Sequence, residues 1–321
     1  AVAAIQPAGS AGGGPGTYET VRTLEDLDRW VSRVGKAGIF AFDTETTGID
    51  PYAAELVGFS LCVRSGEACY VPVKAPFGEG LGLTAVLPRL KSMLEGDGAR
   101  LVGQNVKFDY KVLRRLGINL RPWFDTMIAA WLLDADAGSF GLDRLAEVHL
   151  GYETVHYDSV VPKGETFDAV PLEEATRYAA EDADVAFRLY EVFSARLRER
   201  SLEKLFFDLE MPLVRILGNM ELAGIRLDPG VLEAYGLELE KSLAALQQDI
   251  YRLCGREFNI NSTKQLQEIL FDGRKLSPSK KTKTGFSTDI SVLEEMARED
   301  PVPEKILRHR TLAKLKSTYV D

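Results

Sequence analysis

Two acidic residues, Asp43 and Glu45, follow directly after an apolar run in the segment FAFDTETTGID at residues 40–50. The apolar run is typical of a buried strand, and side chains two residues apart on a strand point to the same face. We therefore expect Asp43 and Glu45 to share one face while Thr44 points to the other. Carboxylates this close raise each other's pKa unless a cation intervenes, and their oxygens suit Mg²⁺ or Mn²⁺. The alternative is a solvated strand end without a function.

Two later segments add further acids. VGQNVKFDYKVL places Asp109 in the first turns of a predicted helix, and RYAAEDADV separates Tyr178 from Asp182 by four residues. That spacing puts phenol and carboxylate on one helix face, one turn apart, while Glu181 and Asp184 point elsewhere. Taken singly, Asp109 is typical of an acid that favours a helix start. The Tyr178–Asp182 pair is typical of an acidic surface over a packed tyrosine.

Strands and helices must bring these residues together. Residues 37–45 read as a strand, and residues 56–73 read as a hairpin interrupted at Ser65–Gly66. A helix interrupted by Pro88, a short strand over 100–106 and a second helix follow. This order predicts a mixed α/β domain.

The second part of the chain is predicted to be mainly helical. Residues 171–200 and about 231–255 have apolar residues at helical spacing, and shorter helical patterns lie around both. We place a domain boundary near Arg200, which divides the chain into residues 18–200 and 201–321. Residues 1–17 are rich in Ala, Gly and Pro and read as a flexible linker.

Composition excludes several classes of protein. The chain has 321 residues, 45% of them apolar and 27% charged, as in a folded globular protein. Its longest apolar runs are far shorter than the ~20 residues of a membrane span. Three cysteines and three histidines without ligand spacing argue against disulfides, a zinc site and a Ser-His-Asp triad. We expect a protein of the reducing cytoplasm.

A local positive charge contrasts with the formal net charge of −9. Between Gly273 and Phe286 the chain carries five cations and no acid. These candidate phosphate-binding residues are Arg274, Lys275, Lys280, Lys281 and Lys283. The alternative is an ordinary solvated loop.

Together, the three acidic segments follow the order DxE, NxxxD and YxxxD, which resembles the DEDDy 3′–5′ exonucleases. The resemblance extends over nearly the whole chain after the linker. The segments FDTETTG, VGQNVKFD, FDTM, RYAAEDADV, EMPLV, FNINSTKQLQEIL and LAKLKSTY resemble the bacterial DNA polymerase I family, also called family A. This implies an RNase H-like exonuclease domain, with a mixed sheet flanked by helices. A mainly α-helical, thumb-like start of the polymerase domain would follow.

The resemblance also implies a mechanism. Two divalent ions, Mg²⁺ or Mn²⁺, would activate a water and stabilise the departing 3′ oxygen. Asp43 would bridge both ions, Glu45 and Asp182 would complete the site of the attacking water, and Asp109 would support the second ion through water. Tyr178 would orient the water, since a phenol with a pKa near about 10 is a poor base at neutral pH.

Substrate contacts are implied by the same resemblance. Ile49 matches a position that wedges an apolar side chain against the terminal base, and Gln104, Asn105 and Phe108 match positions along the single-strand path. Without the family, Ile49 and Phe108 would equally suit core packing. Many relatives have Tyr at the position of Phe108 and Arg at that of Ser139.

The predicted function is metal-dependent removal of nucleotides from DNA 3′ ends, as in proofreading during replication and repair. We expect a monomer that binds single-stranded 3′ ends at the carboxylates and duplex DNA at the thumb. The chain ends before the palm and fingers of the family, so we expect no DNA synthesis from it alone and read it as part of a longer polymerase. The alternatives are an RNase D-like exoribonuclease and a catalytically inactive DNA-binding module.

Overall fold

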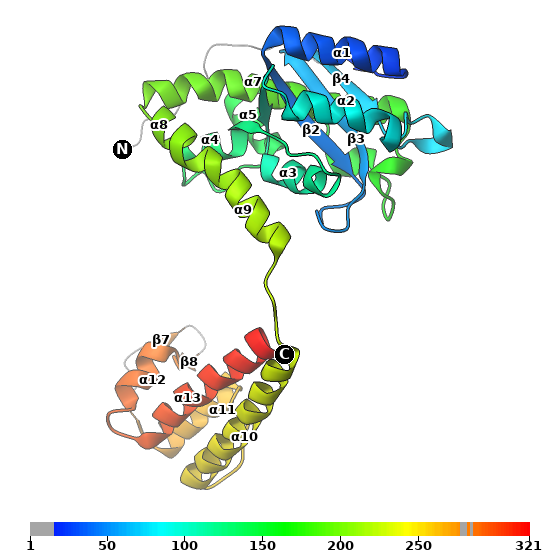
Figure 1. Cartoon of the computed structure of the whole chain (residues 1–321). Coiled ribbons are helices and arrows are strands. Elements are labelled where there is room, and N and C mark those ends of the chain that lie inside the picture. The colour runs from blue at the N-terminus through cyan, green and yellow to red at the C-terminus, as the bar shows by residue number, and fades with distance from the viewer. Residues whose placement is uncertain (1–15, 277–280, 283–284) are drawn as a thin grey trace. The chain divides into compact units, whose positions relative to one another are not determined.

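A computed structural model of the chain describes residues 16–276, 281–282 and 285–321. The linker predicted for residues 1–17 lies almost wholly outside the described residues. The chain divides into two compact units, Ala1–Gly224 and Ile225–Asp321 (Figure 1). The first is α/β and the second mainly helical, which confirms the predicted fold class.

A six-stranded mixed sheet forms the centre of the first unit. Its strands lie in the order β1-β4-β3-β2-β5-β6. β2 pairs antiparallel with β3 and parallel with β5, which places it inside the sheet. The bounds are β1 Thr17–Thr20, β2 Ile39–Thr46, β3 Leu56–Arg64, β4 Glu67–Pro72, β5 Arg100–Gly103 and β6 Pro122–Asp125.

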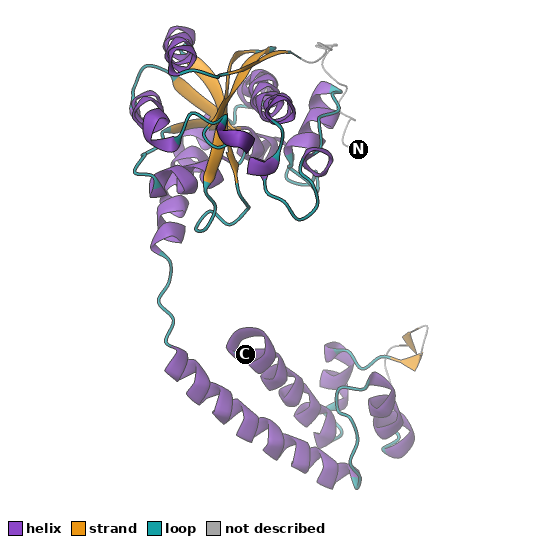
Figure 2. Cartoon of the chain, turned by 90° about the vertical axis from the view of Figure 1, so that its right-hand side faces the viewer, coloured by secondary structure: helices purple, strands orange, loops and turns teal. Residues whose placement is uncertain are grey.

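Helices lie on both faces of this sheet (Figure 2). The longest, α7, spans Leu172–Glu199, which matches the helix predicted for residues 171–200, and it packs along β1 to β5. The other α-helices of the unit are α1 Leu24–Ala37, α2 Leu83–Glu95, α3 Val106–Arg115, α4 Thr126–Leu133, α5 Leu142–Leu150, α6 Tyr157–Val160, α8 Glu203–Leu205 and α9 Met211–Ala223. Short 3₁₀ turns span Pro76–Gly78 and Phe167–Ala169, and a π-helical turn spans Phe206–Glu210.

The core explains why β2 is fixed in the sheet. Phe40 and Phe42 point to one face of β2 and are almost completely buried. Phe42 packs on Phe59 of β3, with ring centroids 5.8 Å apart. Since alternate residues of a strand face opposite sides, burial of these rings directs Asp43 and Glu45 to the other face.

Helix α9 belongs to the first unit, so the compact units divide after Gly224, whereas we expected a boundary near Arg200. The cause is contact with α3. The Tyr110 hydroxyl donates to Asn219 at 2.8 Å, and Lys107 and Lys111 bind the two oxygens of Glu221 at 2.6 and 2.5 Å. These partners are more than a hundred residues apart in sequence, so no local pattern indicates them.

The second unit is built around α10, which spans Pro229–Cys254 and packs against α13, Pro301–Leu315. Both match predicted helices. The side chain of Asp228 caps the start of α10, and that of Asp300 caps the start of α13. The remaining elements are α11 Thr263–Gln267, α12 Ile290–Met296, the paired strands β7 Lys281–Thr282 and β8 Gly285–Phe286, and π-helical turns Glu268–Gly273 and Lys316–Val320.

Candidate functional site

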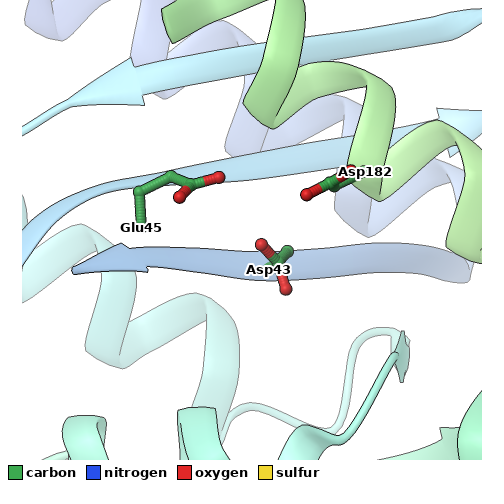
Figure 3. Close-up of side chains that lie close together, drawn as sticks. All are labelled: Asp43, Glu45 and Asp182. Atoms are coloured by element: carbon green, nitrogen blue, oxygen red, sulfur yellow. The ribbon is translucent and has the colours of Figure 1, made fainter. Parts of the chain in front are cut away.

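Three carboxylates meet on one face of the sheet in the first unit. Asp43 and Glu45 project from β2, and Asp182 reaches the same space from α7 (Figure 3). One oxygen of each lies within 4.8 Å of the others. The two-residue spacing on the strand and the course of α7 across the sheet therefore bring together the acids that the sequence pattern singled out.

Asp109 lies beside this group and is held by β2 itself. One of its oxygens, Oδ1, accepts hydrogen bonds from the backbone N–H of Thr44 at 3.0 Å and from the Thr44 hydroxyl at 2.5 Å. The Thr44 N–H is available because the pairing of β2 with β5 stops at Ala41. Asp109 is thus buried against the strand and does not belong to the group of three close oxygens.

Burial and mutual repulsion make the four carboxylates costly to ionise together. Burial raises the pKa of each well above its ordinary value. The charge of Asp182 further raises the pKa of Asp43, and the charge of Asp43 further raises those of Glu45 and Asp109. A bound cation would remove this repulsion.

The site fits hard divalent ions on its own chemistry. Its donors are all carboxylate oxygens, which Mg²⁺ and Mn²⁺ prefer. Glu45 is buried, and among the described residues its Oε1 atom has no hydrogen-bond partner. A buried charged oxygen without a donor is expensive, so a metal ligand is a better account of Glu45 than a structural acid.

Tyr178 stands one helical turn before Asp182, as its spacing predicts. Burial, and then the charge of Asp182, raise its pKa far above that of a free phenol. Its ring packs against Phe167 and Tyr157, with centroids 5.7 and 6.0 Å apart. The group therefore keeps its proton at neutral pH and can orient a water without deprotonating it.

A cavity of about 330 Å³ extends from the carboxylates, and all four predicted substrate-binding residues line it. They are Ile49, Gln104, Asn105 and Phe108. Ile49 is 95% exposed, which excludes the core-packing alternative for that residue. The Gln104 amide donates to the Phe140 carbonyl at 2.8 Å and accepts from the Thr126 hydroxyl. Both ends of this side chain are therefore hydrogen-bonded within the protein.

Sequence reasoning missed two residues of this region. Tyr157 lines the cavity and meets Tyr178 edge-on. Asp125 accepts hydrogen bonds from the N–H groups of Asn105, Val106 and Met127 at 3.1, 2.9 and 2.9 Å. It thereby joins the starts of α3 and α4. Its place directly before the apolar run TMIAAWLL was the available signal, since an Asp there commonly caps a helix.

The two acids that flank Asp182 serve the fold. Glu181 accepts from the Tyr152 hydroxyl and the Val155 N–H, both at 2.6 Å. Asp184 accepts from the Tyr18 hydroxyl at 2.9 Å and pairs with Arg188 at 2.7 Å. Both point away from the carboxylate group, as their helical positions predict.

The predicted positive loop is described only in part. Arg274 pairs with Asp300 at 2.6 Å and donates to the Leu253 carbonyl at 2.8 Å, so its charge is compensated within the unit. Lys275 is exposed and has a left-handed backbone with φ of 58°. Lys280 and Lys283 lie outside the described residues, and Lys281 is described only as backbone of β7.

The described residues contain no candidate for a membrane-spanning helix. Within the described ranges, none of the helices combines the length and hydrophobicity that a bilayer crossing requires.

Comparison with known proteins gives two family matches. Residues 18–198 match a family described as 3'-5' exonuclease, and residues 230–321 match DNA polymerase family A. DNA polymerase I of Rhizobium leguminosarum is 43% identical over 95% of this chain, and that of Treponema pallidum (strain Nichols) is 39% identical over 95%. The chain spans about a third of the length of these relatives, 32% and 34%.

One solved structure resembles the chain along most of its length. It is the POL domain of Pol1 from M. smegmatis, solved as a complex with DNA primer-template and dNTP. The TM-score is 0.78 and the sequence identity 25%, over 94% of this chain and 49% of that one.

Proposed function

Since the chain belongs to the 3'-5' exonuclease family, we propose that residues 18–200 remove nucleotides one at a time from the 3′ ends of DNA. The observation that carries the proposal is the meeting of Asp43, Glu45 and Asp182 within 4.8 Å, with a buried Glu45 oxygen that lacks a donor. A cavity of about 330 Å³ lies beside these acids, and the strand end would enter it.

Asp43, Glu45 and Asp182 would hold one divalent ion, and Asp43 and Asp109 would serve a second. We propose Mg²⁺ as the ion. When bound, two such ions supply an activated water and charge stabilisation for the leaving 3′ oxygen. Asp109 is already oriented by its two bonds from Thr44, so little rearrangement is needed on its side.

Tyr178 would place the attacking water by hydrogen bonding. Its raised pKa keeps the phenol protonated, so the group orients and does not act as the base. Contacts with Phe167 and Tyr157 restrict the ring, which keeps the hydroxyl beside Asp182.

The cavity residues would bind the terminal nucleotides without reading their sequence. Ile49 and Phe108 offer apolar surface to bases, and Tyr157 adds an aromatic face. Asn105 is exposed at the start of α3 and would contact the strand. Such contacts suit single-stranded DNA whose end has separated from its partner.

Residues 201–321 would form a thumb-like region that binds duplex DNA. Support comes from the match to DNA polymerase family A and from the DNA primer-template in the similar structure. Lys275, Lys280, Lys281 and Lys283 are the proposed phosphate contacts, whereas Arg274 is engaged with Asp300. The protein would act as a monomer on bacterial DNA in the cytoplasm, in proofreading during synthesis and repair.

The decisive experiment measures Mg²⁺-dependent shortening of a single-stranded DNA, beside an RNA of the same sequence. The test variant is Asp43→Ala/Glu45→Ala. Its matched control is Glu173→Ala/Glu174→Ala, which removes two exposed acids from α7. We expect the wild type and the control to shorten DNA and the test variant to be inactive.

Two results would contradict the proposal. Preferential shortening of RNA would make the protein an exoribonuclease. DNA binding without shortening, at any Mg²⁺ or Mn²⁺ concentration, would make it a binding module.

A further inference from the structure

The loop that joins β2 to β3, residues 47–55, carries Ile49 at the edge of the cavity. Hydrogen bonds across the base of the loop fix its shape. The Thr47 N–H donates to the Glu55 carbonyl at 3.0 Å, and the Glu55 N–H donates to the Thr47 hydroxyl at 3.0 Å. The loop is therefore closed where it leaves the sheet, and Ile49 projects from its first half.

Arg115, the last residue of α3, binds the second half of this loop. Its Nη1 atom donates to the Pro51 carbonyl at 3.1 Å and to the Ala54 carbonyl at 2.9 Å. Hydrogen bonds from a charged donor are stronger than those between neutral groups. The guanidinium thus fixes the chain immediately after the segment that carries Ile49.

A second contact attaches the same loop to the end of α9. The Tyr52 hydroxyl donates to the Glu221 carbonyl. The Glu221 carboxylate in turn pairs with Lys107 and Lys111 of α3 at 2.6 and 2.5 Å. The ammonium of Lys111 also lies 5.9 Å from the centre of the Tyr52 ring. The loop is therefore attached to α3 directly through Arg115 and indirectly through α9.

Helix α3 carries residues of the site as well as this anchor. Phe108 and Asp109 line the same cavity as Ile49, and Asp109 is bonded to Thr44 of β2. One helix thus fixes an acid at one end and the loop at the other. Because Ile49 is 95% exposed, its own packing cannot hold it in place. Ordering a mobile loop on binding costs affinity, and a loop that is already anchored avoids that cost.

We propose that Arg115 is a positioning residue for the DNA strand end. It holds the loop of residues 47–55 so that Ile49 can cover a base in the cavity. This role rests on the proposed exonuclease function and deepens it, because it names the group that keeps the apolar contact in place. Arg115 acts through Ile49 and does not itself bind the strand.

The test measures the Kd for a 5′-fluorescein-labelled single-stranded DNA by fluorescence anisotropy, in EDTA so that the strand stays intact. The test variant is Arg115→Met, which keeps an unbranched stem and removes the donors. Its matched control is Arg114→Met, at the adjacent exposed arginine of α3. Methionine is a good helix former, so both variants should fold. We expect Arg115→Met to weaken DNA binding by about fivefold and Arg114→Met to change it by less than about twofold.

The salt dependence of the Kd separates positioning from a direct phosphate contact. Loss of one contact with a phosphate of single-stranded DNA would lower the slope of log Kd against log salt by about 0.7. Positioning leaves the slope of Arg115→Met equal to that of the wild type. A lower slope would overturn the inference and make Arg115 a phosphate ligand.

A double-mutant cycle tests whether Arg115 acts through Ile49. If it does, Arg115→Met adds less than about twofold to the loss of DNA binding already caused by Ile49→Ser. Losses that add in full in the double variant would overturn the inference, because the two residues would then act independently.

Kinetics with Mg²⁺ distinguish this inference from the proposed function. Arg115→Met should raise the KM for the single strand by about fivefold and change kcat by less than about twofold, as expected for lost substrate binding. An unchanged KM, with DNA shortening intact, would overturn the role of Arg115 and leave the exonuclease in place. No shortening by the wild type, with the expected coupling in Kd, would overturn the exonuclease and leave Arg115 as the residue that positions Ile49 for DNA binding.

Discussion

Thr44 holds Asp109 through two hydrogen bonds to a single carboxylate oxygen, one from its backbone N–H and one from its hydroxyl. The same strand therefore presents Asp43 and Glu45 and, through Thr44, fixes Asp109 beside them at the same cavity. The relative position of the acids depends on β2 being rigid, and the burial of Phe40 and Phe42 supplies that rigidity.

Thr44→Val should lower exonuclease activity while leaving the strand intact. The change keeps the shape but removes the hydroxyl donor to buried Asp109, which costs about 1–3 kcal/mol. We expect about tenfold slower DNA shortening and a higher Mg²⁺ requirement. Thr20→Val, which removes the hydroxyl that contacts Thr176, is the control. An unchanged Mg²⁺ dependence in Thr44→Val would argue against Asp109 as a metal-site residue.

Divalent ions should stabilise the wild type against heat at neutral pH. Ligand binding to the folded state adds about 2.7 kcal/mol at a hundredfold excess over Kd, or several degrees in Tm for a unit of this size. Asp43→Ala/Glu45→Ala should show no such shift and should melt above the metal-free wild type, because it lacks two repelling buried acids. Calorimetry with and without Mg²⁺ measures the Tm of both proteins. Equal Tm shifts in the wild type and the double variant would mean that the ions bind elsewhere.

Asp125 should make stability fall as pH rises from about 4 to about 6. Burial raises its pKa from 3.8 to about 6 despite the N–H groups that it accepts from. In that interval the folded protein binds more protons than the unfolded chain, so up to about 1.4 kcal/mol is lost per pH unit. The free energy of unfolding of Asp125→Asn, measured in urea, lacks this contribution. The stability of the variant relative to the wild type should therefore increase as the pH rises from about 4 to about 6. If the stabilities of the variant and the wild type change in parallel with pH, the raised pKa of Asp125 is contradicted.

Gly218→Ala and Gly35→Ala should have opposite effects on stability. A Cβ on Gly218 of α9 would lie 2.7 Å from the Tyr110 ring of α3, whereas one on Gly35 of α1 meets nothing within 4 Å. We expect Gly218→Ala to destabilise by about 1–3 kcal/mol and Gly35→Ala to stabilise by about 0.5–1 kcal/mol. Chemical unfolding measures both, and equal effects would mean that α9 does not pack tightly on α3.

Ile49→Ser should weaken binding of single-stranded 3′ ends without affecting the fold. The side chain is 95% exposed, so its removal leaves the free energy of unfolding nearly unchanged. Covering an isoleucine with a base is worth about 1.5–3 kcal/mol at most, so we expect about tenfold weaker DNA binding. Ile290→Ser, at an exposed residue of the second unit, is the control. Equal affinities for the two variants would remove Ile49 from the substrate site.

Local patterns were sufficient for much of the fold. Apolar spacing gave α7 and α10 nearly to their ends, and the two-residue spacing put Asp43 and Glu45 on one face. Pro88 was expected to interrupt its helix, yet α2 continues through it from Leu83 to Glu95. Packing of the buried face of α2 thus outweighed the helix-breaking tendency of Pro88.

Features that join distant segments could not be predicted in this way. The bond of Thr44 to Asp109 spans 65 residues, and the ion pair of Arg274 with Asp300 spans 26. The run of cations around Arg274 gave no sign that one of them has an internal partner. The placement of Tyr70 over Gly58 likewise depends on the register of β3 and β4.

Gly58 has a genetic consequence. Any single-nucleotide change that replaces a glycine codon with that of another amino acid introduces a Cβ atom, and here that atom would collide with the Tyr70 hydroxyl. Position 58 therefore has no conservative substitute. A missense change at this codon would force the Tyr70 ring or the strand opposite Glu45 to move while every acidic residue of the site stays in the sequence, so a comparison of those acids alone would overlook it.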